Sequence, residues 1–206
     1  PVSLIEQAPG LRVRTADLRA TLEGEDGLLD LTLDFTRCED HPPASVEVGA
    51  VGAPLSWGPD GRLSGHVRLP KVEKWWPRTH GTPALHPVRV RIGDVTIDLG
   101  FTGFRTIEID RGSDGKGFAI VVNGHRLFAR GACWSAADLV SLAGDRASLA
   151  PWLERAAEAN MNMVRAGGTM TYESDDFFRL CDELGLLVWH DFMFANMDYP
   201  IDRKST

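Results

Sequence analysis

From Leu127 onward the chain repeats one plan three times, and this repeat constrains the fold more than any other feature. Each repeat is a short apolar run that ends in polar or aromatic residues, with amphipathic segments between the runs. The runs are Leu127–Arg130, Met161–Arg165 and Leu186–His190. Strands that alternate with helices predict a parallel sheet, and reactive side chains in such sheets gather beyond the carboxyl-terminal ends of the strands.

Two amphipathic helices are expected between these strands. The first is predicted to open near Ser148 to Pro151, with one apolar stripe that covers the sheet, formed by Leu149, Trp152, Leu153, Ala156 and Ala157. The second follows the cap residue Ser174 and stops at Gly185, with an apolar face of Phe177, Phe178, Cys181 and Leu184. A closed barrel needs about 250 residues and eight strands. We therefore interpret the chain as part of an enzyme.

The first half of the chain predicts a different fold. From Ala16 to about Ile109, apolar and polar residues alternate with a period of two, as in Leu29, Leu31 and Leu33, and glycine, proline and aspartate interrupt the pattern. Gly93–Asp94 and Asn123–Gly124 are hairpin signals. We expect a mixed fold with two domains, an immunoglobulin-like β-sandwich over residues 1–110 and a partial (β/α) barrel segment over residues 111–206.

Composition excludes several classes of function. A net charge of -7 and a pI near 5.3 argue against nucleic acid as a partner, because phosphate binding needs clustered lysine and arginine. No apolar run approaches the ~18 residues of a membrane span, so a soluble chain without membrane association is expected. Three cysteines and six histidines show no metal-ligand spacing. We expect no metal and no cofactor, and slightly favour a reducing, cytoplasmic compartment.

Candidate binding residues lie at the predicted strand ends. Trp134 and Asp138 are in the first loop, Arg165 ends the second strand, and Asp191 follows the third. Aromatic rings beside charged groups suit a sugar, whose C–H faces stack while its hydroxyls form hydrogen bonds. Each residue also admits a structural role: Trp134 in the core, Asp138 in a turn or cap, and Arg165 with Asp191 as an ion pair.

Five segments resemble a known family. Three of them are similar to the start of the catalytic barrel of β-mannosidases and related β-glycosidases of glycoside hydrolase family 2, namely Gly131–Asp138, Glu158–Arg165 and Cys181–Ala195. Trp75–Pro77 and Gly103–Thr106 resemble the end of the immunoglobulin-like domain that precedes that barrel. The matches cover about half of the chain in the family's order.

The resemblance implies a retaining exo-β-glycosidase, in which one carboxylic acid protonates the leaving oxygen and a second carboxylate about 5 Å away attacks the anomeric carbon. In the family these carboxylates follow the fourth and seventh barrel strands. No residue here matches either one, so no catalytic residue is assigned, and the isolated chain is predicted to be inactive. By analogy, Arg165 supports the nucleophile, and Trp134, Asp138 and Asp191 line the pocket of a terminal β-mannoside or related β-glycoside.

Two departures from the family pattern leave the sugar open. Gly167 stands where many β-mannosidases have a tryptophan, and His190 stands where glutamine is common. Glu173 is assigned to the entry of the second helix rather than to catalysis. A non-catalytic carbohydrate-binding or adhesion module remains the alternative. An open edge of a partial barrel would also expose apolar surface, so association with another copy or another chain is expected.

Overall fold

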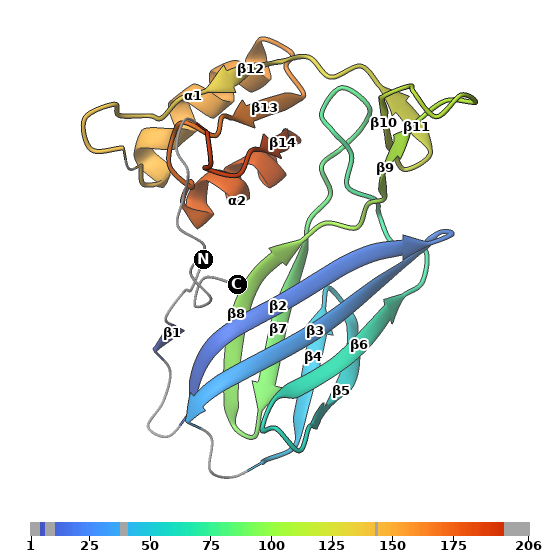
Figure 1. Cartoon of the computed structure of the whole chain (residues 1–206). Helices are drawn as coiled ribbons and strands as arrows, with labels where there is room; N and C mark the ends of the chain where they lie inside the picture. The colour runs from blue at the N-terminus through green and yellow to red at the C-terminus, as the bar shows by residue number, and fades with distance from the viewer. Residues whose placement is uncertain (1–4, 7–10, 38–40, 143, 196–206) are drawn as a thin grey trace. The chain divides into compact units, whose positions relative to one another are not determined.

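A computed structural model describes residues 5–6, 11–37, 41–142 and 144–195 (Figure 1). The chain divides into two compact units. One comprises Pro1–Trp76 and Ala84–Leu127, and the other comprises Pro77–Pro83 and Phe128–Thr206. Contacts therefore group residues 111–127 with the first unit. No helix in the described ranges has the length and apolar character needed to cross a membrane.

The first unit is built mainly on one nearly closed antiparallel sheet of eight strands, in the order β1-β2-β3-β6-β5-β4-β7-β8. The strands are β1 (Ile5–Glu6), β2 (Arg12–Glu23), β3 (Asp26–Arg37), β4 (Ala44–Val48), β5 (Val51–Trp57), β6 (Leu63–Leu69), β7 (His86–Ile92) and β8 (Val95–Thr102). β5 and β6 pair only through Ser56 and Trp57 opposite Ser64 and Leu63. The inward side chains of seven strands, with Phe104, form one apolar core.

The period of two in the sequence explains this core. Leu29, Leu31 and Leu33 of β3 are buried, whereas Asp30 between them is exposed. The Gly93–Asp94 hairpin is confirmed, because Ile92 pairs with Val95 across it.

A second, three-stranded sheet of the first unit has the order β11-β10-β9, with β9 (Ile107–Asp110), β10 (Ala119–Val122) and β11 (His125–Leu127). Asn123 and Gly124 join β10 to β11 with φ values of 49° and 78°. Positive φ at both central residues is what a type I′ turn requires. The predicted hairpin is therefore confirmed.

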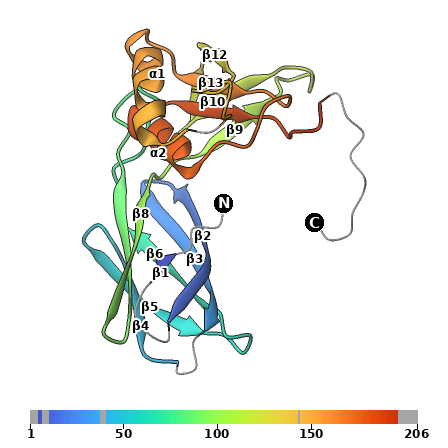
Figure 2. The same cartoon turned by 90° about the vertical axis from the view of Figure 1, so that its left-hand side faces the viewer.

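The second unit contains a parallel sheet in the order β12-β13-β14, formed by β12 (Gly131–Trp134), β13 (Met163–Ala166) and β14 (Leu187–His190). The helices α1 (Arg146–Glu158) and α2 (Asp175–Leu184) alternate with these strands and pack along one side of them (Figure 2). The predicted alternation of strands and helices is confirmed.

The predicted position of the first parallel strand was wrong. Leu127 ends β11, where it pairs with Ile120, and the parallel strand begins only at Gly131. The apolar run at Leu127 belongs to the antiparallel hairpin and not to the sheet that follows. As a result, Trp134 lies at the carboxyl-terminal end of β12.

Both helices form where the sequence predicts them, with one difference in the apolar stripe. Asp145 caps α1 by accepting a hydrogen bond from the Ser148 N–H, so the helix begins two residues before the expected start. Leu149 and Leu153 are buried, but Trp152 is 52% exposed and lies beneath the Arg155 guanidinium, so its predicted place in the buried stripe was wrong. α2 ends at Gly185, which has the left-handed φ of 67°.

Candidate functional site

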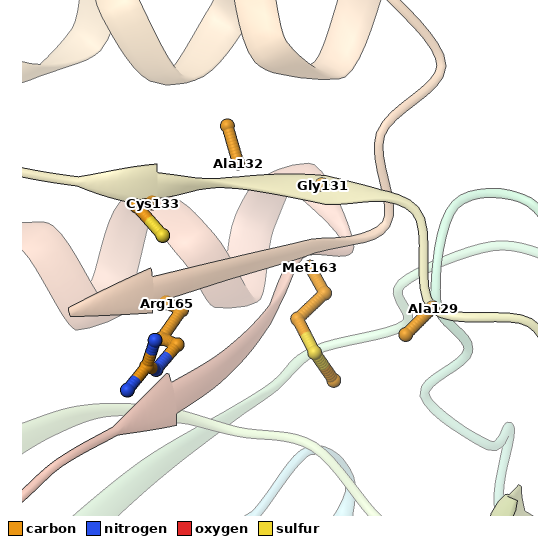
Figure 3. Close-up of a pocket in the computed structure, with 6 residues that line it drawn as sticks. All are labelled: Ala129, Gly131, Ala132, Cys133, Met163 and Arg165. Carbon is orange, nitrogen blue, oxygen red and sulfur yellow. The ribbon is translucent and has the colours of Figure 1, made fainter. Parts of the chain in front are cut away.

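A cavity of about 250 Å³ opens on the second unit beside β12 and β13. It is lined by Ala129, Gly131, Ala132, Cys133, Met163 and Arg165. Figure 3 shows the side chains of Cys133, Met163 and Arg165 on one side of the strands and that of Ala132 on the other. The cavity is therefore bordered chiefly by the sheet face that α1 and α2 do not cover.

The strand register determines which side chains share that face. Cys133 is opposite Arg165, and Arg165 is opposite Trp189, so these three form one row across the sheet. The next row is Trp134, Ala166 and His190. Because successive side chains of a strand point to opposite faces, the two rows lie on opposite sides of the sheet.

Arg165 and Asp191 form a bidentate ion pair at the strand ends. The Arg165 Nε–H donates to Asp191 Oδ1 at 3.3 Å, and Nη2 donates to Oδ2 at 2.6 Å. The Gly168 N–H adds a third hydrogen bond to Oδ2 at 3.3 Å. The hydrogen bonds from Arg165 hold the pKa of Asp191 below its usual value, and those to Asp191 raise the pKa of Arg165. The Arg165 side chain remains 52% exposed and accessible to a ligand.

Trp134 lies on the other face of the sheet from Arg165. Its indole N–H donates to Glu173 Oε1 at 2.7 Å, and its ring lies 5.2 Å from that of Phe177 in α2. Sequence reasoning assigned Glu173 only to the entry of α2 and missed this hydrogen bond. The two residues are 39 positions apart, and no sequence pattern indicates their contact.

Asp138 is exposed and bonded within its own loop. Its carboxylate accepts hydrogen bonds from the Val140 N–H at 2.8 Å and from the Ser141 hydroxyl at 2.7 Å. The bond from Val140 is the main cause that lowers the pKa of Asp138. This is turn geometry, and among the described contacts none joins Asp138 to Arg165 or Asp191.

His190 belongs to an aromatic cluster on the opposite face of the sheet from Arg165. Its ring is stacked on that of Tyr172 at 5.2 Å and lies 5.9 Å from that of Phe178. Nδ1 is 2.8 Å from the Asp191 carbonyl oxygen. Nε2 is buried and has no hydrogen-bond partner in the part of the chain that the structure describes.

The site is suited to binding a neutral, polar ligand. Within the described ranges, no group of three or more histidine, cysteine, aspartate or glutamate residues could hold a metal ion. The guanidinium of Arg165 is neutralised by Asp191 but half-exposed, so it can donate hydrogen bonds to hydroxyl groups without attracting a strongly charged ligand.

Comparisons with known proteins find similarity to proteins named as β-mannosidases. No family model matches the sequence. The chain is 37% identical over 134 residues to "Beta-mannosidase B" of Aspergillus flavus, a match that covers 61% of this chain and 16% of the relative. It is 38% identical over 141 residues to the bovine (Bos taurus) "Beta-mannosidase", covering 64% of this chain and 16% of the relative. The matches thus span about a sixth of the length of these curated relatives.

Solved structures show the same fold. The crystal structure of β-D-mannosidase from Dictyoglomus thermophilum matches with a TM-score of 0.78 and 27% identity, over 95% of this chain and 26% of that one. β-Glucuronidase 3 of Bacteroides uniformis matches with a TM-score of 0.70 over 91% of this chain and 24% of that one. Its identity is 22%, so this second likeness concerns the fold alone.

Proposed function

We propose that this chain, which is similar to β-mannosidases of glycoside hydrolase family 2, forms part of a retaining exo-β-glycosidase acting on terminal β-linked sugars. The resemblance predicted from the sequence motifs is thereby confirmed. The relatives named β-mannosidase make a terminal β-mannoside, or a related β-glycoside, the proposed carbohydrate partner.

The proposed architecture is an immunoglobulin-like sandwich over residues 1–110 followed by the first part of a (β/α)8 barrel over residues 111–206. Support for the first domain is the antiparallel sheet around one apolar core. Support for the second is the parallel order β12-β13-β14, with helices on one face only. In a barrel of this kind the uncovered face, which carries Cys133, Arg165 and Trp189, would point inward.

The observation that carries the proposal is the Arg165–Asp191 pair at the carboxyl-terminal ends of parallel strands. Active sites of (β/α)8 enzymes are built at that end of the barrel. The pair is bidentate, and its half-exposed member Arg165 lines the cavity. We propose that Arg165 and Asp191 contact sugar hydroxyls or support the catalytic carboxylate.

Trp134 and Asp138 keep their proposed substrate-binding roles in a more indirect form. Trp134 would contribute by fixing the end of β12 through its contacts with Glu173 and Phe177. Asp138 would act through the loop that it shapes with Val140 and Ser141. Glycosidases of this kind orient the sugar with several such loops around the barrel mouth.

Gly167 directly follows β13, and because it has no side chain the proposed pocket has no aromatic wall at this position. A Cβ added at Gly167 would meet no atom within 4 Å, so the surrounding space is open. The proposed site would therefore tolerate sugars other than mannose at the terminal position.

The 206-residue polypeptide alone is proposed to be inactive. Retaining hydrolysis needs an acid and a nucleophile about 5 Å apart. The Asp191 carboxylate, which pairs with the cavity residue Arg165, is already committed to Arg165 and Gly168. Neither family carboxylate has a matching residue in the sequence.

Sugar binding by the pure chain tests the proposal. Methyl β-mannopyranoside would be titrated into 15N-labelled protein, with methyl β-glucopyranoside as a matched ligand. We expect shifts at the Arg165 Nε–H, the Gly168 N–H and the Trp189 indole, and loss of the Gly168 and Trp189 shifts in Arg165→Leu. The Arg126→Leu variant is the control, because Arg126 pairs with Asp110 on the first unit.

Two results would contradict the proposal. Shifts confined to the first unit would favour a non-catalytic carbohydrate-binding or adhesion module, and no shifts with either sugar would contradict the proposed sugar contact at Arg165. Turnover of an aryl β-mannoside by the pure chain would show that the proposed inactivity is incorrect.

A further inference from the structure

Asp191 has a hydrogen-bond partner for each of its polar groups, in its backbone as well as in its carboxylate. Its N–H donates to the Ala166 carbonyl at 3.0 Å, which continues the ladder between β13 and β14. Its carboxylate accepts from Arg165 and Gly168. Its carbonyl oxygen faces His190 Nδ1 at 2.8 Å. The position of the carboxylate therefore depends on how the peptide group after Asp191 is held.

The His190 ring is itself fixed by neighbouring aromatic residues. Tyr172 lies parallel to it, with 8° between the ring planes, and Phe178 covers it at an angle of 30°. The Tyr172 hydroxyl also accepts a hydrogen bond from the Met193 N–H at 3.4 Å. Tyr172 thus contacts the chain on both sides of Asp191, at His190 and at Met193.

The protonation of His190 follows from its contacts. A carbonyl oxygen only accepts hydrogen bonds, so Nδ1 must carry the proton that it shares with Asp191. In the tautomer with its proton on Nδ1, Nε2 is an unprotonated nitrogen, and it is the atom that is buried without a partner in the described ranges. Among the described residues, the polar anchor of the ring is therefore the Asp191 carbonyl.

We propose that His190 is a positioning residue, whose Nδ1–H holds the Asp191 carbonyl and thereby fixes the carboxylate that pairs with Arg165. The consequence for sugar recognition rests on the proposed function, because the Arg165–Asp191 pair is the proposed sugar contact. The positioning itself requires no sugar.

The competing role for His190 is packing, since its ring fills the space between Tyr172 and Phe178. Two variants separate these roles. His190→Asn keeps an N–H donor close to the position of Nδ1 but removes most of the ring. His190→Phe keeps a ring of similar size but removes the donor. Positioning requires the donor, and packing requires the ring.

The readout is the pKa of the Asp191 carboxyl, followed by 13C NMR during a pH titration. Arg165, the Gly168 N–H and the Trp189 side chain surround this carboxylate and lower its pKa. We expect the pKa of Asp191 to rise toward its ordinary value in His190→Phe and to stay near that of the wild type in His190→Asn. Urea unfolding of each variant would measure the packing contribution separately.

The reverse pattern, or no change in either variant, would overturn the positioning role. A second measurement on the unmodified chain does not depend on how the variants fold. In the 15N spectrum of the uncharged ring, Nδ1 of His190 should carry the proton and Nε2 should not, and a ring protonated only at Nε2 would also overturn the inference. A chain that passes both tests but binds no glycoside would refute the proposed function and leave the positioning role intact.

Discussion

Asn162 is a fully buried polar residue that joins three segments of the second unit. Its side-chain oxygen accepts from the Arg130 N–H at 2.8 Å, and its amide nitrogen donates to the Thr79 hydroxyl at 3.0 Å and the Phe128 carbonyl at 3.1 Å. Its backbone also receives the Leu187 N–H. This residue holds the segment before β12 against β13.

Asn162→Ala should lower the free energy of unfolding by about 2–4 kcal/mol, because it leaves buried polar groups without partners. Urea unfolding followed by the signals of the second unit would measure this loss. Arg130→Ala is the matched control, since Arg130 bonds to Asn162 only through its backbone and its side chain is exposed. Equal stability of Asn162→Ala and Arg130→Ala would refute this role.

The pH dependence of the Arg165–Asp191 pair has a defined direction. The pKa of Asp191 is lower in the folded chain than its ordinary value of about 3.9. The pair's stabilising contribution is therefore fully present above about pH 4 and is lost as the pH falls through the folded-state pKa.

Asp191→Asn removes this contribution, so the stability difference between the wild type and Asp191→Asn should shrink as the pH is lowered from about 6 to about 3. Unfolding curves at several pH values would show this, and Arg165→Gln should reproduce the trend. A difference that does not change with pH would mean that the pair is not formed in solution.

At the scale of the strands and helices, the sequence predicted the kind of element better than its place. The period of two predicted the inward residues of β3 correctly, and the helix signals at Ser174 and Gly185 bounded α2. The first parallel strand was misplaced because Leu127 also fits the end of a hairpin, and only the pairing with Ile120 decides between the two. A local pattern cannot show which partner a short apolar run will find.

The candidate site illustrates the same limit of local patterns. The strand ends predicted Arg165 and Asp191 as neighbours, and the structure pairs them. The face on which Trp134 lies depends on the register of β12 against β13. The sequence prediction placed the first parallel strand too early in the chain, so it could not give this register. The hydrogen bond between Trp134 and Glu173 depends on tertiary packing alone, so no spacing in the sequence could predict it.

Gly131 determines whether β12 can pair with β13. A Cβ at this position would lie 1.8 Å from the Met163 carbonyl oxygen, so the strands would have to separate. Gly131→Ala should therefore cost at least about 2 kcal/mol of unfolding free energy. It should also speed amide hydrogen exchange in β12 and β13.

Gly167→Ala is the matched control for this variant. Both substitutions reduce the conformational entropy of the unfolded chain to a similar extent. A Cβ at Gly167, however, has open space around it. We expect Gly167→Ala to leave exchange in β12 unchanged. Similar exchange rates in the two variants would show that the close approach at Gly131 is not maintained.

At the scale of the whole molecule, the second unit exposes several large apolar side chains. The most exposed are Val140, Phe128, Phe192 and Leu139, at 93%, 79%, 76% and 70%. Exposed apolar surface of this kind favours association. Light scattering after size exclusion should show a mass that increases with protein concentration, and a monomer at every concentration would contradict this expectation.

The central claim is that this chain supplies a working portion of a β-glycosidase, and a graft into a related enzyme tests it most directly. The segment of Dictyoglomus thermophilum β-D-mannosidase that matches 95% of this chain would be replaced by the present sequence. Size exclusion would establish that the chimera is folded, and hydrolysis of aryl β-mannosides and related aryl β-glycosides would then be measured.

The account predicts hydrolysis by the folded chimera, a loss of about 100-fold or more in Arg165→Met because a positioning group is removed, and little change in Arg126→Met. A folded chimera that cleaves none of these glycosides, or one whose activity does not depend on Arg165, would contradict the account.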